Sequence, residues 1–482
     1  MISTRKILLI GYGAVARCVL PILLRHITVP YQHITVVDFA EPPAELHAWM
    51  AQGIRFIQER LTPDNLPQML ASHAGPGGLV IDLSWNVDSV ELMQWCHDHD
   101  TLYVNTSLEE WDPQAGMRSR STLEKSLYTR HMQLRAAAAQ WRSTAATAVL
   151  DHGANPGLIS HFTRQGLADI TRNRLEAPAV NNGEKRRLAE LLDQQDFARL
   201  AMRLGVRVIH CSERDMQITS RPKEVDEFVG TWSIQGLYEE CVAPAEIGWG
   251  THEDPPSLAA VFPDDGPRNQ IFLCQMGMNT WVRSWIPQQE IVGMVIRHGE
   301  AFTISDSLTV RDENGAAAYR PTVHYAYMPC HETLSSLHEL RCRNYELQPK
   351  QRIMRDEIVQ GKNVLGALLM GDCGAWWTGS SLDINEARRL VPHQNATTVQ
   401  VAIGLAAAVL WMLEHPWQGL CVPDDLPYDR ILALAKPYLG EFLSVPSDWT
   451  PFINSPVFFK EHPKVALHPA NPWSFENFIF RP

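Results

Sequence analysis

The sequence predicts an α/β protein whose N-terminal part is a doubly wound parallel sheet and whose second part carries a mixed sheet. Three observations predict this class. A glycine-rich turn near Gly11 joins a short apolar segment to a helix-like one. Apolar segments of strand length then alternate with helical ones as far as Gly157, and the alternation ends there. The chain has 482 residues, which is too long for one ordinary core.

The first strand is predicted at Lys6–Ile10, followed by the turn Gly11-Tyr-Gly13-Ala14-Val15-Ala16 and a helical stretch. Gly11 allows the tight turn, Gly13 lets the backbone approach a pyrophosphate, and Ala16 permits close packing of helix on strand. The helix N-terminus, with Ala14 and Val15, offers free N–H groups to phosphates. This pattern is typical of a Rossmann dinucleotide-binding domain.

Asp38 follows the next predicted strand, Ile34–Val37. An acidic residue there is placed to hold the ribose hydroxyls, which favours NAD over NADP. Arg17 argues in the other direction, because a basic residue near the ribose could tolerate the 2′-phosphate of NADP. We therefore expect NAD as the cofactor.

Further buried strands are predicted at Ile54–Ile57, Leu79–Leu83, Leu102–Val104 and Ala148–Leu150, with helices such as Ser89–His97 and Glu124–Trp141 between them. In parallel sheets ligands bind beyond the carboxyl ends of the strands. The residues at these strand ends are of types that also form turns and helix caps. Because they all lie at the same edge of the sheet, a role in binding cofactor or substrate is favoured. They are Ser84, Asn86, Asn105, Thr106, Ser107, Asp151, Gly153, Ala154, Asn155 and Pro156.

Past Gly157 the pattern predicts helices at Leu158–Ile170 and Arg186–Leu204, a loop at Asn181–Gly183, and strands at Val206–His210 and Ile291–Arg297. We expect an NAD-binding domain over 1–157 and a substrate-binding and dimerisation domain over 158–390. A helix within 391–414 returns to the first domain, and 415–482 forms an irregular C-terminal arm.

Composition narrows the class of protein. Nine scattered cysteines, without a CxxC pair or a zinc-type cluster, favour a reducing, cytoplasmic compartment and no metal site. The net charge of −12 disfavours nucleic acid and anionic membrane as partners. The longest apolar run, Val401–Leu413, is too short to cross a bilayer and predicts a buried alanine-rich helix.

Several polar strings in the second half have no evident folding purpose: Cys211–Asp215, Gly230–Ser233, Tyr238–Glu240, Arg297–Glu300, Ala375–Gly379 and His393–Thr397. Together with the Rossmann start and Asp151–Gly157, this ordered set resembles the bacterial homospermidine synthase family, in the saccharopine dehydrogenase-like superfamily. The resemblance runs from about residue 5 to about residue 415. It implies an NAD-dependent aminobutyl transfer that condenses two putrescines to homospermidine with release of ammonia, through imine and Schiff-base intermediates and without net redox.

The resemblance also implies roles for single residues. Trp232 would face the reacting amine, Asn155 would lie between nicotinamide and substrate, and four residues would line the diamine channel: Glu213, Glu240, His298 and Glu300. These types suit a dication, because a buried ammonium needs carboxylates and an indole face attracts cations. Of these groups, His298 is the natural carrier of protons near neutral pH. The family implies a homodimer, and spermidine is a further candidate substrate.

One departure concerns the end of the channel. An acidic residue is expected before the apolar run Val364–Leu369, yet the sequence has Lys362 and Asn363. This leaves open how the far ammonium is held and which diamine is used.

Two other functions remain open. A saccharopine- or carboxynorspermidine-type NAD(P)-dependent dehydrogenase would need arginines for its carboxylate substrate, and Arg221, Arg283, Arg297 and Arg320 are available. A non-catalytic NAD-binding protein would have a second domain without a polar centre.

Overall fold

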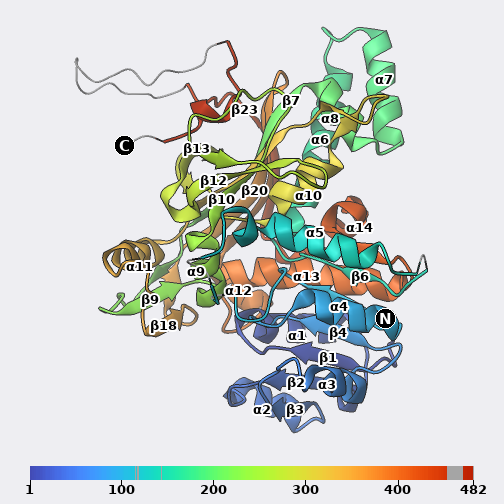
Figure 1. The fold of residues 1–482 in the computed structure, drawn as a ribbon, viewed down its shortest axis with the longest axis vertical. Coiled ribbons are helices and arrows are strands. Elements are labelled where there is room, and N and C mark those ends of the chain that lie inside the picture. The colour runs from blue at the N-terminus through green and yellow to red at the C-terminus, as the bar shows by residue number, and fades with distance from the viewer. Residues whose placement is uncertain (114, 117–118, 143, 453–469, 481–482) are drawn as a thin grey trace.

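In the computed structural model, the described residues are 1–452 and 470–480, except 114, 117, 118 and 143. Two sheets lie one above the other along the long axis of the molecule, with one long helix between them (Figure 1). The predicted class, a doubly wound parallel sheet joined to a second α/β domain with a mixed sheet, is confirmed.

The first sheet has seven parallel strands and a core of aliphatic side chains on both faces. Its order is β22 (Leu420–Cys421), β6 (Ala148–Val149), β5 (Leu102–Asn105), β4 (Leu79–Asp82), β1 (Ile7–Ile10), β2 (Ile34–Asp38) and β3 (Arg55–Gln58). Five helices accompany it: α1 (Ala14–His26), α2 (Ala44–Met50), α3 (Leu66–His73), α4 (Ser89–Asp98) and α5 (Leu127–Ala138). The strand order reverses between β1 and β4, the point where such sheets bind dinucleotides.

Within the part of the chain that the structure describes, the second sheet has ten strands, and only its β17–β7 pair is parallel. The main path is β11 (Ala260–Val261), β12 (Gln270–Met276), β10 (Pro244–Gly248), β17 (Thr322–Met328), β7 (Val206–Asp215), β20 (Lys362–Gly371), β21 (Gly374–Asp383) and β23 (Glu441–Ser447). The hairpin β13 (Trp281–Ile286) and β14 (Gln289–Met294) joins it at β17. Three small pairs stand apart: β8 (Ile218–Thr219) with β19 (Ile358–Gln360), β9 (Glu227–Gly230) with β18 (Lys350–Ile353), and β15 (Val310–Arg311) with β16 (Ala317–Tyr319).

The helices of the second part are α6 (Leu158–Glu176), α7 (Asn182–Asp193), α8 (Phe197–Leu204), α9 (Ile234–Val242), α10 (Gly299–Ser307), α11 (His331–Cys342), α12 (Ile384–Leu390), α13 (Ala396–Glu414) and α14 (Tyr428–Ala435). The long helix between the sheets is α13, which contacts α1 and β5 on one side and β20 and β21 on the other (Figure 1). It is long and apolar enough to span a membrane, but 89% of its apolar window is buried inside the protein. The prediction of a buried alanine-rich helix is confirmed.

Several local predictions were wrong. Residues 186–204 form two helices, because Gln195 has φ +54° and Asp196 caps α8 by accepting a hydrogen bond from the Arg199 N–H. The expected loop at 181–183 is the start of α7, where Asn181 accepts from the Glu184 N–H. The strand from Val206 runs on to Asp215, so the polar Cys211–Asp215 string lies on a central strand. The strand expected at 291–297 is β14, which ends at Met294.

The C-terminal segment was also predicted wrongly. Residues beyond 415 were expected to form an irregular arm, yet they contain β22, α14 and β23. The first of these strands completes the parallel sheet beside β6, and the last forms an edge of the mixed sheet beside β21. A two-residue strand and a strand that contains Pro446 carry little local signal, because their pairing partners lie far away in the chain. The remaining domain boundaries stay predictions.

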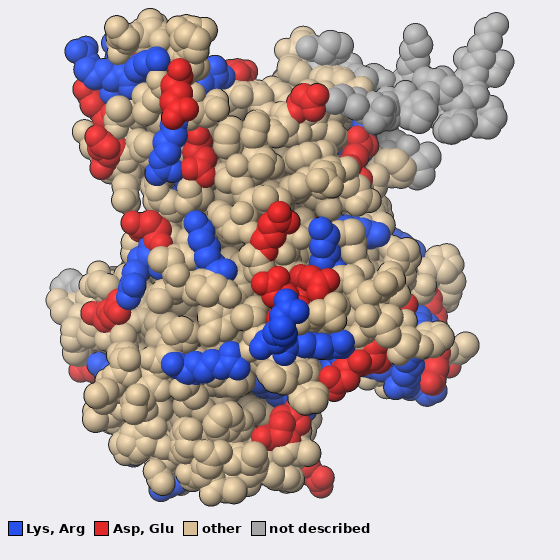
Figure 2. All heavy atoms as spheres, turned by 180° about the vertical axis from the view of Figure 1, so that it is seen from behind, with Lys and Arg blue, Asp and Glu red and all other residues tan. Residues whose placement is uncertain are grey.

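The face of the molecule shown in Figure 2 interleaves acidic and basic side chains, many of them near the waist. Large uncharged areas lie above and below that waist.

Candidate active site

The glycine turn has the geometry that a dinucleotide requires. Gly11 has φ +81°, and a Cβ there would lie 2.7 Å from the Leu83 carbonyl oxygen. At Gly13, by contrast, a Cβ would meet no atom of a described residue within 4 Å. The backbone at Gly13 is therefore open to a pyrophosphate in front of α1, and the residues present fit such a group.

Asp38 ends β2 and is held by main-chain donors. Its carboxylate accepts hydrogen bonds from the N–H of Tyr12, at 2.6 Å, and of Ala40, at 2.8 Å. Arg17 points elsewhere: its guanidinium contacts Glu45 at 3.2 Å and donates to the Tyr12 carbonyl at 3.3 Å. The predicted ribose position thus presents a carboxylate fixed by two main-chain donors, while Arg17 is paired with Glu45.

The strand-end residues of the first sheet divide into two kinds. Asn105 is buried, donates to the Ser107 carbonyl and to the Tyr103 hydroxyl, and accepts from the Asp151 N–H. Its side chain therefore ties β5 to β6. Four other residues at the same edge are half-buried: Ser84, Asn86, Thr106 and Ser107. Their contact with the cofactor stays a prediction.

The segment after β6 connects the two parts of the protein. A Cβ at Gly299 would lie 2.7 Å from an Asp151 carboxylate oxygen, and that oxygen lies 3.3 Å from His131. Gly153 packs against α13, where a Cβ at Gly404 would overlap its carbonyl oxygen. Ala154 and Pro156 continue this packing, Ala154 in the core and Pro156 beside Gly299. The segment therefore presents Asn155 toward the mixed sheet.

Glu213 is the centre of the first acidic group. Its carboxylate accepts hydrogen bonds from the amides of Asn155 and Asn363, both at 2.7 Å, and from the Tyr325 hydroxyl. The residue is 2% exposed. Burial raises the pKa of Glu213 to about 7, although these three hydrogen bonds act to lower it. Glu213 can therefore gain or lose a proton near neutral pH.

Asn363 explains how the chain fills the position where an acid was expected. Its amide nitrogen also donates to Gln400, at 2.9 Å, so both hydrogens are used. The side-chain carbonyl oxygen of Asn363 is buried and accepts no hydrogen bond from a described residue. A second carboxylate at this position would repel Glu213, whereas the amide fixes Glu213 and leaves one neutral acceptor.

Sequence reasoning missed Tyr325 and Tyr327. Both lie on β17, which runs parallel to β7 with Tyr325 opposite Cys211 and Tyr327 opposite Glu213. Their rings stack at 5.4 Å between centroids. The alternation Tyr-Ala-Tyr was the available signal, because residues two apart share one face of a strand.

The second acidic group surrounds His298, at the N-terminus of α10. One ring nitrogen lies 2.9 Å from Glu240 and the other 3.4 Å from Glu300. These two carboxylates raise the pKa of His298 well above its usual value, despite burial. The ring keeps its proton at neutral pH, so the prediction that His298 titrates near neutrality was wrong; Glu213 has that property.

Glu300 is fully buried, and neither of its carboxylate oxygens accepts a hydrogen bond from a described residue. The His298 ring contacts Tyr325 at 4.3 Å between centroids, which joins the two acidic groups. The acidic centre thus combines the buried carboxylates of Glu213 and Glu300 and the half-buried carboxylate of Glu240 with the His298 imidazolium.

Trp232 is half-buried just before α9, and its indole N–H donates to the Tyr327 hydroxyl at 3.4 Å. The indole therefore lies on the aromatic side of the Glu213 group. The structure brings together all six residues predicted for catalysis: Asn155, Glu213, Trp232, Glu240, His298 and Glu300.

The neighbouring Glu239 has a structural role. It pairs with Arg130 at 2.7 Å and with Arg297. Together these two guanidinium groups hold the pKa of Glu239 at about 2, against the effect of burial. Arg297 is therefore occupied within the protein.

The other arginines considered for a carboxylate substrate are also engaged. Arg221 pairs with Glu224, Arg283 pairs with Glu290, and Arg320 donates to main-chain carbonyls. None of the four candidate guanidinium groups is left unpaired to bind a substrate carboxylate at the acidic centre.

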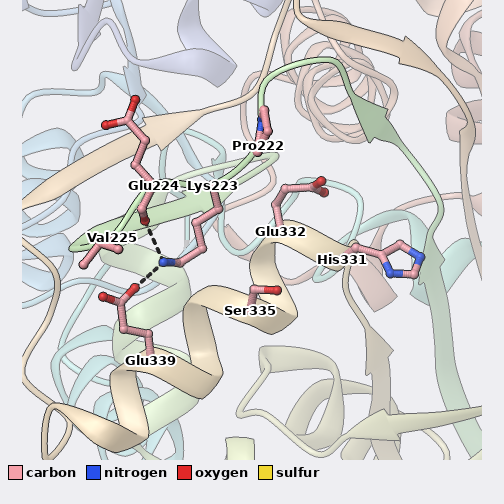
Figure 3. Close-up of a pocket in the computed structure, with 8 residues that line it drawn as sticks. All are labelled: Pro222, Lys223, Glu224, Val225, His331, Glu332, Ser335 and Glu339. Atoms are coloured by element: carbon pink, nitrogen blue, oxygen red, sulfur yellow. Dashed lines mark hydrogen bonds and ion pairs between the residues drawn. The ribbon is translucent and has the colours of Figure 1, made fainter.

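A separate surface hollow, of about 500 Å³, lies between the 222–225 loop and α11 (Figure 3). Lys223 crosses it, donating to the Glu224 carbonyl and pairing with Glu339. It contains none of the predicted site residues, so we assign the chemistry to the buried centre.

Comparison with known proteins agrees with this architecture. Residues 7–149 match the saccharopine dehydrogenase NADP binding domain, and residues 153–445 match the saccharopine dehydrogenase C-terminal domain. The fold and the site thus define a saccharopine dehydrogenase-like protein.

Homospermidine synthase of Blastochloris viridis is 39% identical over 98% of this chain and 97% of its own length. The enzyme of Mesorhizobium japonicum is 35% identical over 99% and 97%. A solved homospermidine synthase from Legionella pneumophila, in complex with NAD, superposes with a TM-score of 0.87 at 32% identity, covering 100% of this chain and 99% of that one. The chain belongs to the homospermidine synthase family of enzymes.

Proposed function

We propose that this enzyme uses NAD to condense two putrescines to homospermidine, with release of ammonia and no net redox. The observation that carries the proposal is the buried acidic centre, above all Glu300, whose carboxylate oxygens have no hydrogen-bond donor among the described residues. Glu300 shares the single His298 imidazolium with Glu240, and a buried carboxylate that lacks hydrogen bonds is costly, so an ammonium of a diamine would supply the charge and donors that are missing. The names of its relatives support the same reaction.

The cofactor fits the first domain through the open backbone at Gly13 and the ordered carboxylate of Asp38. The matched domain family is named for NADP, but a carboxylate at the ribose favours NAD, as in the Legionella complex. When bound, NAD would supply the hydride acceptor for oxidation of the carbon that carries an amine and, once reduced, the hydride donor for the new imine carbon.

The acidic residues hold the substrate and move its protons. Glu213, with its pKa of about 7, accepts the proton that an ammonium must lose before its carbon can be oxidised. His298 stays protonated, and its positive charge balances one of the two neighbouring carboxylates, Glu240 and Glu300. These three side chains together therefore keep one negative charge, which can pair with one ammonium. The aromatic side chains of Trp232, Tyr325 and Tyr327 wall the centre without accepting a proton.

Trp232→Ala should lower kcat/KM for putrescine by about tenfold to thirtyfold, because a desolvated cation–π contact contributes roughly 2 kcal/mol. Trp232→Phe should recover part of the loss, since a phenyl face still attracts cations. Steady-state kinetics of both variants checks this. Equal losses in the two variants would contradict a cation–π role.

The main alternative is a dehydrogenase that reduces an imine bearing a carboxylate. The engagement of the four candidate arginines with protein groups disfavours it. The test is to incubate the purified enzyme with putrescine and NAD and to measure ammonia, polyamine products and NADH absorbance. Homospermidine and ammonia without NADH accumulation support the synthase, whereas stoichiometric NADH contradicts it.

We further propose that the enzyme is a cytoplasmic homodimer that does not depend on nucleic acid or membrane. All nine cysteines are free, as expected in a reducing compartment. Sedimentation of the purified chain measures the assembly state, and a monomeric active enzyme would contradict the dimer.

A further inference from the structure

An ion-pair chain joins the two parts of the protein beside the predicted ribose position. Glu45, in the first turn of α2, contacts Arg17 of α1 and Arg355 of the second part, each at 3.2 Å. Arg355 is fixed further by donating to the His393 carbonyl at 3.0 Å. One carboxylate thus restrains two guanidinium groups that come from different parts of the chain.

This chain of contacts reaches Asp38 through Tyr12. Arg17 donates to the Tyr12 carbonyl at 3.3 Å, and the Tyr12 N–H donates to the Asp38 carboxylate at 2.6 Å. Burial raises the pKa of Tyr12 to about 12, an effect that Glu45 increases and both arginines oppose. All three charges therefore act at the turn that precedes α1.

An arginine fork is the side chain best suited to a phosphate, because it offers two parallel N–H donors. NADP differs from NAD only by a phosphate on the ribose hydroxyl that an acid at the end of β2 would hold. Arg17, which contacts Tyr12 next to Asp38, and Arg355, which shares Glu45 with Arg17, would therefore favour NADP if they were free. Their pairing with Glu45 removes that attraction.

We propose that Glu45 determines dinucleotide specificity: it holds Arg17 and Arg355 away from the ribose and so prevents them from binding a ribose 2′-phosphate. This inference rests on the proposed binding of NAD by the first domain. Glu45 is a specificity-determining residue and takes no part in the acidic centre.

The test measures the binding of NAD and NADP to the full chain, freed of bound nucleotide, by isothermal titration calorimetry. Glu45→Gln should tighten NADP binding about tenfold, as one freed arginine–phosphate contact predicts, and change NAD binding less than about twofold. Glu41→Gln, an exposed acid just before α2, is the matched control and should change neither. Adding Arg17→Ala to Glu45→Gln should reverse most of the gain.

The outcomes separate the two claims. Unchanged NADP binding in Glu45→Gln, with wild-type binding of NAD, overturns the specificity role. An equal gain in Glu41→Gln also overturns it, because the effect would then be one of net charge. A wild-type chain that binds neither dinucleotide contradicts the proposed function itself. The exposed pair is worth little to folding, so the variant should stay folded, which circular dichroism checks.

Discussion

Glu213→Gln should lower kcat/KM for putrescine by about 10²–10⁴, the range expected for loss of a general base. The glutamine keeps the shape of the side chain, but its NH2 group replaces one of the two oxygens that accept hydrogen bonds from Asn155, Asn363 and Tyr325. It cannot accept the proton of an ammonium or balance its charge. The wild-type kcat/KM should rise as the pH increases through about 7, and this limb should disappear in the variant.

The same substitution should raise stability above neutral pH. The pKa of Glu213 is about 7 in the folded enzyme and near 4.5 when exposed, so between these values the folded state holds a proton that the unfolded chain has lost. The contribution of Glu213 to stability therefore falls as pH rises from about 4.5 to 7. Thermal unfolding should show that Glu213→Gln lacks this fall and exceeds the wild type above pH 7.

Glu253 offers a matched control. It is also buried, with a pKa of about 7, but it holds Ser474 and Phe475 of the C-terminal segment. Glu253→Gln should change the pH dependence of unfolding and leave the pH limb of kcat/KM unchanged. Loss of that limb in Glu253→Gln, or its persistence in Glu213→Gln, would contradict the role of Glu213.

Glu300→Gln should raise the KM for putrescine about a hundredfold, because breaking one buried ion pair costs about 3 kcal/mol or more. The carboxylate accepts no hydrogen bond from a described residue, and the His298 ring beside it, at 3.4 Å, keeps its closer contact with Glu240, at 2.9 Å, in the variant. The melting temperature without substrate should therefore fall only slightly. Steady-state kinetics and thermal unfolding together check the prediction.

Glu239→Gln is the contrasting variant, because its carboxylate already pairs with Arg130 and Arg297. It should lose stability, since two buried guanidinium groups would lack their partner. A large drop in the melting temperature of Glu300→Gln, with unchanged KM, would show that Glu300 is structural and contradict its role in binding.

The first domain could be predicted from the sequence because its signals are local. Gly11, Gly13 and Asp38 lie within 28 residues, and each strand has its own apolar run. The six residues predicted for catalysis could be named only through the resemblance, since separations such as that between Asn155 and Glu213 carry no spacing signal. Tyr325 and Asn363 were missed as partners of Glu213 because strand register decides those contacts. The strands β22 and β23 were missed for the same reason.

In the proposed reaction, the hydride that leaves the substrate is returned to the product by the same bound cofactor. The test uses putrescine that carries deuterium at both nitrogen-bearing carbons, mixed with enzyme, NAD and excess unlabelled NADH. Mass spectrometry should find homospermidine that keeps every deuterium, together with one ammonia per product. Homospermidine with one deuterium fewer would show exchange with free cofactor, and label accumulating in NADH without homospermidine would show a dehydrogenase.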